Sequence, residues 1–202
     1  DSEQGIINYS LTTPPDIQIY NIDGGYSSIS RQGFTNPNPI AMAMLNEIKL
    51  DRRKLNGNLF FEVTPIKNLV WHAEVGYDLS SDRARNFMPT VDLGTWKRSK
   101  NSASVQKSSG TFWQLKNYLT YTNTIDKHSF SAMLGQEAWE SKYDFNRTSN
   151  TDLPSNTVNN PALGTGTPAI AVGFGSSAMS SFFTRLTYGY DNRYNATYTY
   201  RY

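Results

Sequence analysis

Residues 69–80 read LVWHAEVGYDLS, and their apolar and polar side chains alternate with a period of two. The apolar set is Leu69, Trp71, Ala73, Val75, Tyr77 and Leu79. Successive side chains of a β-strand point to opposite faces, so this alternation predicts a strand with one apolar and one mainly polar face. Residues 55–64 alternate in the same way, and the intervening residues 65–68 form a tight turn. The two segments are therefore expected to form a β-hairpin.

Two further hairpins follow along the chain. Residues 113–122 lead through a short connection at 124–128 into residues 130–134, and residues 182–190 turn at 191–193 and return as 194–202. The sequence thus predicts an all-β, antiparallel chain.

The connections between these hairpins differ greatly in length. Short turns alternate with long connections, which are expected at 81–110 and 142–180, and the opening residues 1–50 resemble a third. Compact soluble domains rarely contain structureless loops longer than about 15 residues. Strands with one apolar face, short turns at one end and long loops at the other are typical of a transmembrane β-barrel in an outer membrane. The alternative is a soluble β-sandwich, acting as a glycan-binding module or adhesin, whose strands also alternate.

The composition excludes several other classes of protein. The 202 residues are 38% hydrophobic and have no apolar run of the length that a membrane-spanning helix needs. An aromatic content of 13% argues against intrinsic disorder. The net charge of only +2 predicts no nucleic-acid partner. The chain has no cysteine, so disulfides, zinc–thiolate sites and thiol nucleophiles are excluded. Its polar, acidic start does not resemble a signal peptide.

The sequence offers no constellation for catalysis, a metal or a cofactor. His72 and His128 are the two histidines, and neither has a second histidine at metal-ligand spacing. Glu137 and Glu140 are close in sequence, but on a strand their odd spacing sends them to opposite faces. We therefore expect a protein that is not an enzyme and that holds no metal or cofactor.

The alternation assigns side chains to the two faces of the predicted barrel wall. His72, Glu74 and Asp78 are expected to face the lumen. Residues expected to face lipid are Trp71, Val75, Tyr77, Leu115, Leu119, Leu134 and Leu186. Trp113 and Trp139, taken as lying near strand ends, are expected in the aromatic girdles at the membrane interfaces.

A resemblance to a known family adds to this interpretation. The segments that carry it are NPNPIA at 36–41, PDIQIYNIDG at 15–24, LVWHAEVGYD at 69–78, LGQE at 134–137 and SFFTRLTYGYDNRY at 181–194, the last being the most specific. With these segments, most of the chain resembles the barrel of SusC/RagA-type TonB-dependent outer-membrane transporters of Bacteroidetes.

The resemblance implies a larger transporter. Residues 1–202 would be part of one barrel of about 22 strands with a plugged lumen. The plug, the N-terminal domain and the remaining strands would lie outside this sequence. Such a protein imports an oligosaccharide or a peptide across the outer membrane. The implied partners are the rest of the barrel, outer-membrane lipid, TonB through the absent N-terminal region, and a SusD-like surface lipoprotein acting as a lid. Phe87 and Trp96, placed in the middle of the 81–110 loop, are expected to contact that lid or the substrate.

Overall fold

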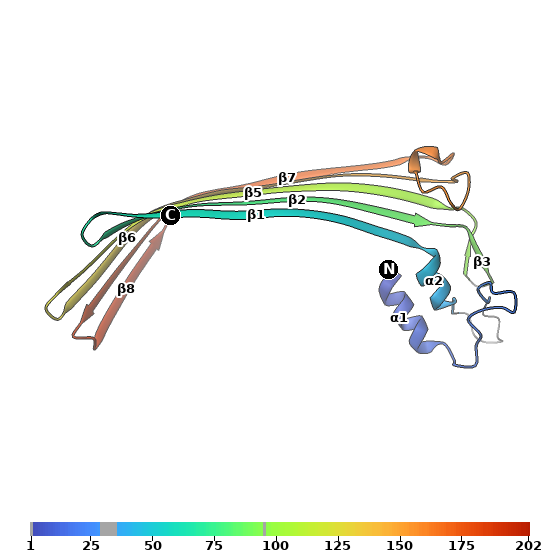
Figure 1. Ribbon diagram of the computed structural model, residues 1–202, viewed down its shortest axis with the longest axis horizontal. Coiled ribbons are helices and arrows are strands. Elements are labelled where there is room, and N and C mark those ends of the chain that lie inside the picture. Colours follow the sequence, from blue (N-terminus) through green and yellow to red (C-terminus); the bar gives the residue numbers. More distant parts are fainter. Residues whose placement is uncertain (1, 29–35, 95) are drawn as a thin grey trace. The chain divides into compact units, whose positions relative to one another are not determined.

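A computed structural model describes residues 2–28, 36–94 and 96–202 (Figure 1). Six long strands form one sheet in the order β1-β2-β5-β6-β7-β8, so strands that follow one another in the chain lie side by side. Their bounds are Glu47–Ile66 for β1, Leu69–Met88 for β2, Ser102–Ile125 for β5, His128–Thr151 for β6, Ala169–Tyr190 for β7 and Tyr194–Arg201 for β8. The predicted strand-rich meander of antiparallel hairpins is confirmed.

The chain divides into two compact units, each of which takes part of every long strand except β8. The first unit contains residues 1–51, 82–107 and 146–172. The second contains residues 52–81, 108–145 and 173–202. The short turns belong to the second unit and the long connections to the first.

The three predicted short turns of the second unit are confirmed. They lie at residues 67–68, 126–127 and 191–193, between strands that end and begin directly beside them. Asn68, Asp126, Asp191 and Asn192 have φ angles of 69°, 51°, 50° and 52°. Asn and Asp adopt this left-handed conformation more readily than other residues with a side chain, which explains their presence in the turns.

The last hairpin, β7–β8, turns at the predicted residues and is paired along the whole length of β8. Tyr190 lies opposite Tyr194, and the pairing continues to Phe183 opposite Arg201. Because side chains alternate along a strand, Leu186, Tyr188, Tyr198 and Tyr200 share one face, while Phe183, Arg185, Thr199 and Arg201 share the other.

The first unit contains the helices and a small second sheet. Helix α1 spans Ser2–Thr12, helix α2 spans Pro39–Leu45 and a 3₁₀ turn, η1, spans Pro161–Leu163. Strands β3 (Val91–Leu93) and β4 (Trp96–Arg98) form a separate antiparallel hairpin in the connection between β2 and β5. In the part of the chain that the structure describes, no helix is long and apolar enough to span a membrane.

Prediction of the opening residues 1–50 as a loop was wrong. This segment contains α1 and α2, and β1 begins within it at Glu47, while residues 29–35 lie outside the described part of the chain. Helix α2 starts where the side chain of Asn38 accepts a hydrogen bond from the backbone N–H of Ala41, with Pro39 in the first helical turn. Asn at the cap followed by Pro is a helix-start pattern, which the prediction of a long connection over residues 1–50 overlooked.

The predicted connections at 81–110 and 142–180 were too long. Strand β2 continues to Met88 and β5 begins at Ser102, while β6 continues to Thr151 and β7 begins at Ala169. Trp113 and Trp139 therefore lie well inside strands rather than near strand ends. In the extended part of β2, residues 81–88 (SDRARNFM), apolar and polar side chains no longer alternate although the strand continues. The strands are defined there by backbone hydrogen bonds to neighbouring strands, which the alternation of apolar and polar side chains does not reveal.

A small core in the first unit corrects the position of Phe87. Phe87 lies on β2 and is only 6% exposed, packed in a cluster with Ala103, Leu153 and Val158. Its placement in the middle of a loop was wrong, because β2 extends eight residues beyond residue 80.

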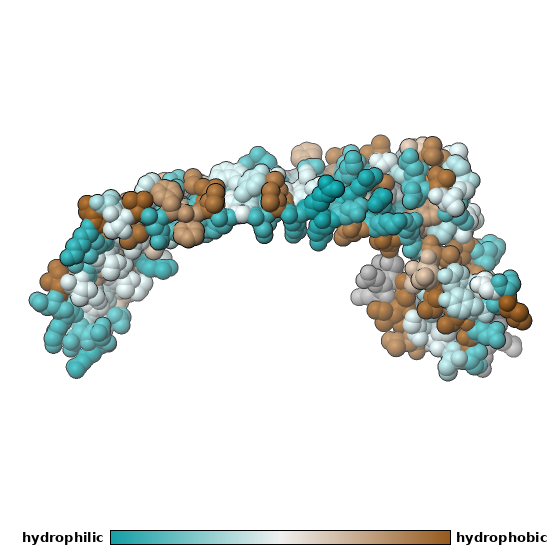
Figure 2. All heavy atoms as spheres, in the orientation of Figure 1, coloured by the Kyte–Doolittle hydropathy of each residue, from teal (hydrophilic) through white to brown (hydrophobic). Residues whose placement is uncertain are grey.

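The apolar side chains of the second unit remain exposed. Leu59 is 80% exposed, Leu134 62% and Val75 51%, and apolar residues are visible on the surface in Figure 2. A β-sandwich would bury such side chains between two sheets. Residues 69–80 belong to a single six-stranded sheet, so the sandwich alternative is not supported.

Candidate functional site

Within the second unit, the six-stranded sheet has two chemically different faces. On one of them, Phe61 meets Trp71 edge-on with ring centroids 5.1 Å apart, and Phe130 stacks on Tyr188 at 6.1 Å. We call this the apolar face. The opposite face, which we call the polar face, carries His72, Glu74 and their neighbours. Even positions of β1, β2 and β5 and odd positions of β6, β7 and β8 belong to the polar face.

His72 is at the centre of one cluster on the polar face. Its Nδ1 lies 3.0 Å from Oε1 of Glu62 and its Nε2 lies 3.5 Å from Oε2 of Glu74. His72 is 8% exposed, and its imidazole stacks on Tyr118, with centroids 4.5 Å apart, and on Phe60 at 5.7 Å. The ring therefore has a carboxylate at each nitrogen and an aromatic ring on each face.

Glu137 is at the centre of a second cluster on the same face. Its Oε1 accepts a hydrogen bond of 2.6 Å from Nε2 of Gln114, and its Oε2 accepts one of 2.7 Å from Nη2 of Arg201. The same Nη2 donates to Oγ of Ser181 at 2.9 Å. Four strands are thus joined through polar side chains, which suits a surface in contact with water and a polar ligand.

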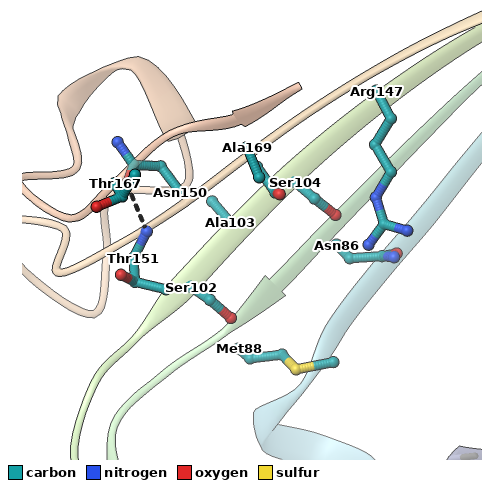
Figure 3. Close-up of a pocket in the computed structure, with 11 residues that line it drawn as sticks. Asn86, Met88, Ser102, Ala103, Ser104, Arg147, Asn150, Thr151, Thr167 and Ala169 are labelled. Carbon is teal, nitrogen blue, oxygen red and sulfur yellow. Dashed lines mark hydrogen bonds between the residues drawn. The ribbon is translucent and has the colours of Figure 1, made fainter. Parts of the chain in front are cut away.

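The first unit has a groove lined mainly by uncharged polar side chains, with a volume of about 310 Å³ (Figure 3). Asn86, Ser102, Ser104 and Thr151 contribute hydrogen-bonding groups. Arg147 is the one cation in its lining and extends toward Asn86. Such a lining can hydrogen-bond hydroxyl, amide or carboxylate groups, but it has no acid–base pair for chemistry on a ligand.

The β3–β4 hairpin of the first unit carries Trp96. Its side chain is half-buried, and the Arg98 guanidinium lies 5.5 Å from the centre of its ring. Arg98 also donates to Oδ1 of Asn46 at 3.1 Å and to the carbonyl of Pro89 at 3.0 Å. Burial lowers the pKa of the Arg98 guanidinium from its ordinary value.

The connection beyond β6 is fixed by Asn101, a buried residue. Its Nδ2 donates to the carbonyls of Leu153 and Ser155 at 3.1 and 3.2 Å, and its Oδ1 accepts from the backbone N–H of Leu153 at 2.6 Å. Lys100 forms an ion pair with Asp152 at 2.5 Å beside it. Both connections are therefore tied together by polar contacts.

The predicted site residues have different outcomes. His72 and Glu74 lie within 3.5 Å of each other on the polar face. Asp78 is half-buried on the same strand and, by the alternation, the same face. Whether this face lines a lumen stays a prediction. Phe87 is buried and Trp96 lies in a short strand, and neither has the loop position on which its choice rested.

Four further residues of the polar face were not among the predicted site residues: Tyr118, Glu137, Phe183 and Arg201. Each lies at an alternate position on a strand, and only the pairing of neighbouring strands brings them together. A register for β5–β8 drawn from the short turns would have placed them on one face. Among the residues that the structure describes, no group of three His, Cys, Asp or Glu side chains is placed to hold a metal ion.

Two comparisons with known sequences bear on the family of this chain. No family model matches the chain. Two curated proteins of Formosa agariphila are similar: TonB-dependent receptor P26 is 24% identical over 98% of this chain, and TonB-dependent receptor P3 is 25% identical over 97% of it. The chain spans only 21% and 20% of their lengths.

Solved structures of the RagAB peptide importer have the same fold. The open-open state matches with a TM-score of 0.81 at 21% identity, over 96% of this chain and 22% of that one. A second RagAB peptide transporter structure matches with a TM-score of 0.78 at 20% identity, over 91% of this chain and 21% of that one. The fold is that of the barrel of a TonB-dependent receptor.

The resemblance predicted from the sequence is thus confirmed, and with it the predicted class of antiparallel barrel segment. TonB-dependent receptors and RagA-type transporters are β-barrel proteins of the outer membrane, which is the predicted location. The named relatives are receptors and transporters rather than enzymes. The six strands of one sheet described here are compatible with one section of a TonB-dependent receptor barrel.

Proposed function

We propose that the protein containing this chain imports a nutrient, an oligosaccharide or a peptide, across the outer membrane in a TonB-dependent manner. The likeness to TonB-dependent receptors over nearly the whole chain carries the proposal. The sheet supports it, because one face is apolar and exposed while the other is rich in charged and hydrogen-bonding groups. The apolar face is suited to lipid and the polar face to a wet lumen.

The chain is proposed to be one section of the barrel domain of a longer receptor, whose plug, N-terminal domain and remaining strands lie outside residues 1–202. Strands β1 and β8 are the edges of the sheet. Open edges are not tolerated in the hydrocarbon region of a membrane. Each edge would therefore pair with a further strand of the same barrel.

The proposed external partner is a SusD-like surface lipoprotein, forming a SusCD-like complex in which the lipoprotein covers the mouth of the barrel. The likeness to RagAB peptide importers supports this kind of partner. The connection between β2 and β5, which carries Trp96 in the β3–β4 hairpin, is the proposed contact with the lid or the substrate. Phe87 would contribute indirectly, because it packs in the buried cluster that supports this connection.

Peptide is the first cargo to test, because the solved relatives are peptide importers. Cells that produce the full-length receptor would be given fluorescent peptides and, separately, fluorescent oligosaccharides. We expect receptor-dependent uptake of one class, abolished when the inner membrane is de-energised. A receptor-deletion strain is the control for passive entry. Recovery of the protein from cells without detergent, or uptake of neither class, would contradict the proposal.

A further inference from the structure

A shallow pocket of about 350 Å³ lies on the polar face of the second unit, and we call it the β5–β8 pocket. Its lining comes from all four strands after which it is named. The residues used in the argument are Lys116, Tyr118, Glu137, Phe183, Arg185 and Arg201. Three cations and one carboxylate line the pocket, so its own side chains carry a net charge of +2.

The single carboxylate of the pocket is already satisfied. One carboxylate oxygen of Glu137 accepts a hydrogen bond from Gln114 at 2.6 Å, and the other accepts one from Arg201 at 2.7 Å. Arg201 is held in place by this pair and by Ser181. Glu137 is therefore occupied in positioning Arg201, and it does not neutralise the two other cations.

Arg185 is the cation without a partner. Its side chain is exposed and makes no hydrogen bond or ion pair with any residue in the described part of the chain. Its backbone pairs with Thr199, two residues along the ladder from the pair of Phe183 and Arg201. Arg185 therefore lies diagonally across from Arg201 on the same face of the sheet, with the two backbones about 7–8 Å apart. An arginine presents a planar fork of donors that matches a carboxylate with two hydrogen bonds.

Lys116 is the second cation that can still donate a hydrogen bond to an added anion. Its ammonium interacts electrostatically with Glu74 on β2, although Glu74 receives its hydrogen bond from Asn58 at 2.8 Å. Lys116 stays free to donate to an anion that enters from the Arg185 side of the pocket.

Two aromatic side chains, Tyr118 and Phe183, also line the pocket and give it an apolar floor. The rings of Tyr118 and Phe183 lie 6.5 Å apart and are tilted by 55°. Phe183 can cross over β6 because residue 135 is glycine, where an added Cβ would lie 2.4 Å from Cζ of Phe183. A cationic rim over an aromatic floor fits an anionic group attached to an apolar or sugar-ring body.

We propose that the β5–β8 pocket binds a carboxylate, with Arg185 as the main contact, Lys116 as the second cation and the rings of Tyr118 and Phe183 as the floor. The carboxylate belongs either to the cargo or to an Asp or Glu side chain of the plug. The choice of these two sources rests on the proposed function, because the cargo and the plug can reach the pocket only if the polar face lines the lumen.

Carbodiimide cross-linking of the purified full-length receptor in detergent tests the proposal. The reagent activates a carboxylate, and a neighbouring lysine amine displaces the activating group to form an amide. Lys116 supplies an amine in the natural protein, and Arg185→Lys supplies a second. The receptor is treated alone and then with two probes, an N-blocked alanine–glycine nonapeptide with a free C-terminus and an oligomer of galacturonic acid. Mass spectrometry identifies the residues joined.

We expect an amide between one of these two amines and a carboxylate outside residues 1–202. A link to a plug residue assigns the carboxylate to the plug, and a link to a probe assigns it to the cargo. Arg185→Gln should then reduce the yield of the Lys116 link about tenfold. Lys142, on the apolar face and 2.8 Å from Glu140, is the internal control and should link only to Glu140.

Links of Lys116 only to Glu74 or Glu137, or no link at all while Lys142 reacts, would overturn the proposal. The cross-link needs no energised membrane. A receptor that links as expected but imports nothing therefore contradicts only the proposed function, and one that imports without any link contradicts only the pocket.

Discussion

The imidazole of His72 on β2 lies face to face with the ring of Tyr118 on β5, with centroids 4.5 Å apart and an interplanar angle of 17°. Phe60 on β1 stacks on the other side of the imidazole at 5.7 Å. Three successive strands of the sheet are thus joined on the polar face by stacked rings. Glu62 and Glu74 hold the imidazole in the plane that this stacking requires.

Replacing His72 should weaken the sheet. In the full-length receptor we expect His72→Ala to lower the free energy of unfolding by about 1–2 kcal/mol, because stacking on two rings is lost. His72→Phe keeps the stacking and loses the contacts with Glu62 and Glu74, so it should recover part of this loss. The readout is the unfolding midpoint of the purified protein in urea. Equal midpoints for His72→Ala and the natural protein would show that the stack contributes nothing.

The two faces of β5 should respond in opposite ways to a charge. Leu119 is exposed on the apolar face, and Thr120 is the next residue, on the polar face. Arginine on the lipid face of a barrel costs about 2–4 kcal/mol at the membrane midplane. We therefore expect Leu119→Arg to reduce the amount of receptor assembled in the outer membrane, while Thr120→Arg leaves it nearly unchanged. Assembly is measured by the heat-dependent gel mobility of folded barrels. The reverse result would mean that the lumen and lipid faces are exchanged.

Gly135 should not tolerate even a methyl group. A Cβ there would lie 2.4 Å from the ring of Phe183 and 2.7 Å from Cβ of Tyr118. The Phe183 ring can rotate away, but Cβ of Tyr118 moves only with its strand. We expect Gly135→Ala to destabilise the receptor by about 1–3 kcal/mol, measured by urea unfolding. Gly57→Ala is the matched control, because nothing lies within 4 Å of a Cβ at Gly57. Equal effects of the two substitutions would show that the close approach at β6 is relieved without cost.

Asn101 should control the order of the connection between β6 and β7. Asn101→Ala leaves the N–H of Leu153 and the carbonyls of Leu153 and Ser155 without their partner, at about 1–3 kcal/mol for each group that remains buried. We expect faster proteolytic cleavage within residues 152–168. Lys97→Ala removes an exposed ion pair with Asp92 and is the control, for which cleavage should not change. An unchanged cleavage rate in Asn101→Ala would show that other contacts hold the connection.

Asn38 should hold the segment between the two helices. Its Nδ2 donates to the carbonyls of Ile19 and Ser27 at 2.9 and 3.1 Å, while its Oδ1 caps α2 through Ala41. Asn38→Asp keeps the cap and loses both donors, whereas Asn38→Ala loses all three bonds. We expect faster amide hydrogen exchange over residues 19–28 in both variants, and faster exchange at the start of α2 only in Asn38→Ala. Identical exchange in the two variants would contradict this division of roles.

The sequence alone determined the fold class and the hairpins. In residues 69–80 and 194–202 the alternation is strong, because the side chains on one face of the strand are mostly apolar and those on the other face are mostly polar. The short turns were also readable, because Asn and Asp at 68, 126, 191 and 192 adopt backbone angles that other residues avoid. Alternation and turn residues are local properties of the sequence, so each hairpin could be predicted from its own residues.

Only the tertiary structure decided how far the strands extend and which side chains meet. Strands β2 and β6 continue past the end of the alternation, because their hydrogen bonds go to neighbours whose positions no local pattern records. Phe87 is buried by Ala103 and Leu153, and Arg201 reaches Glu137 from 64 residues away in the chain. Such contacts depend on the register between strands, and a shift of one residue would move each side chain to the opposite face.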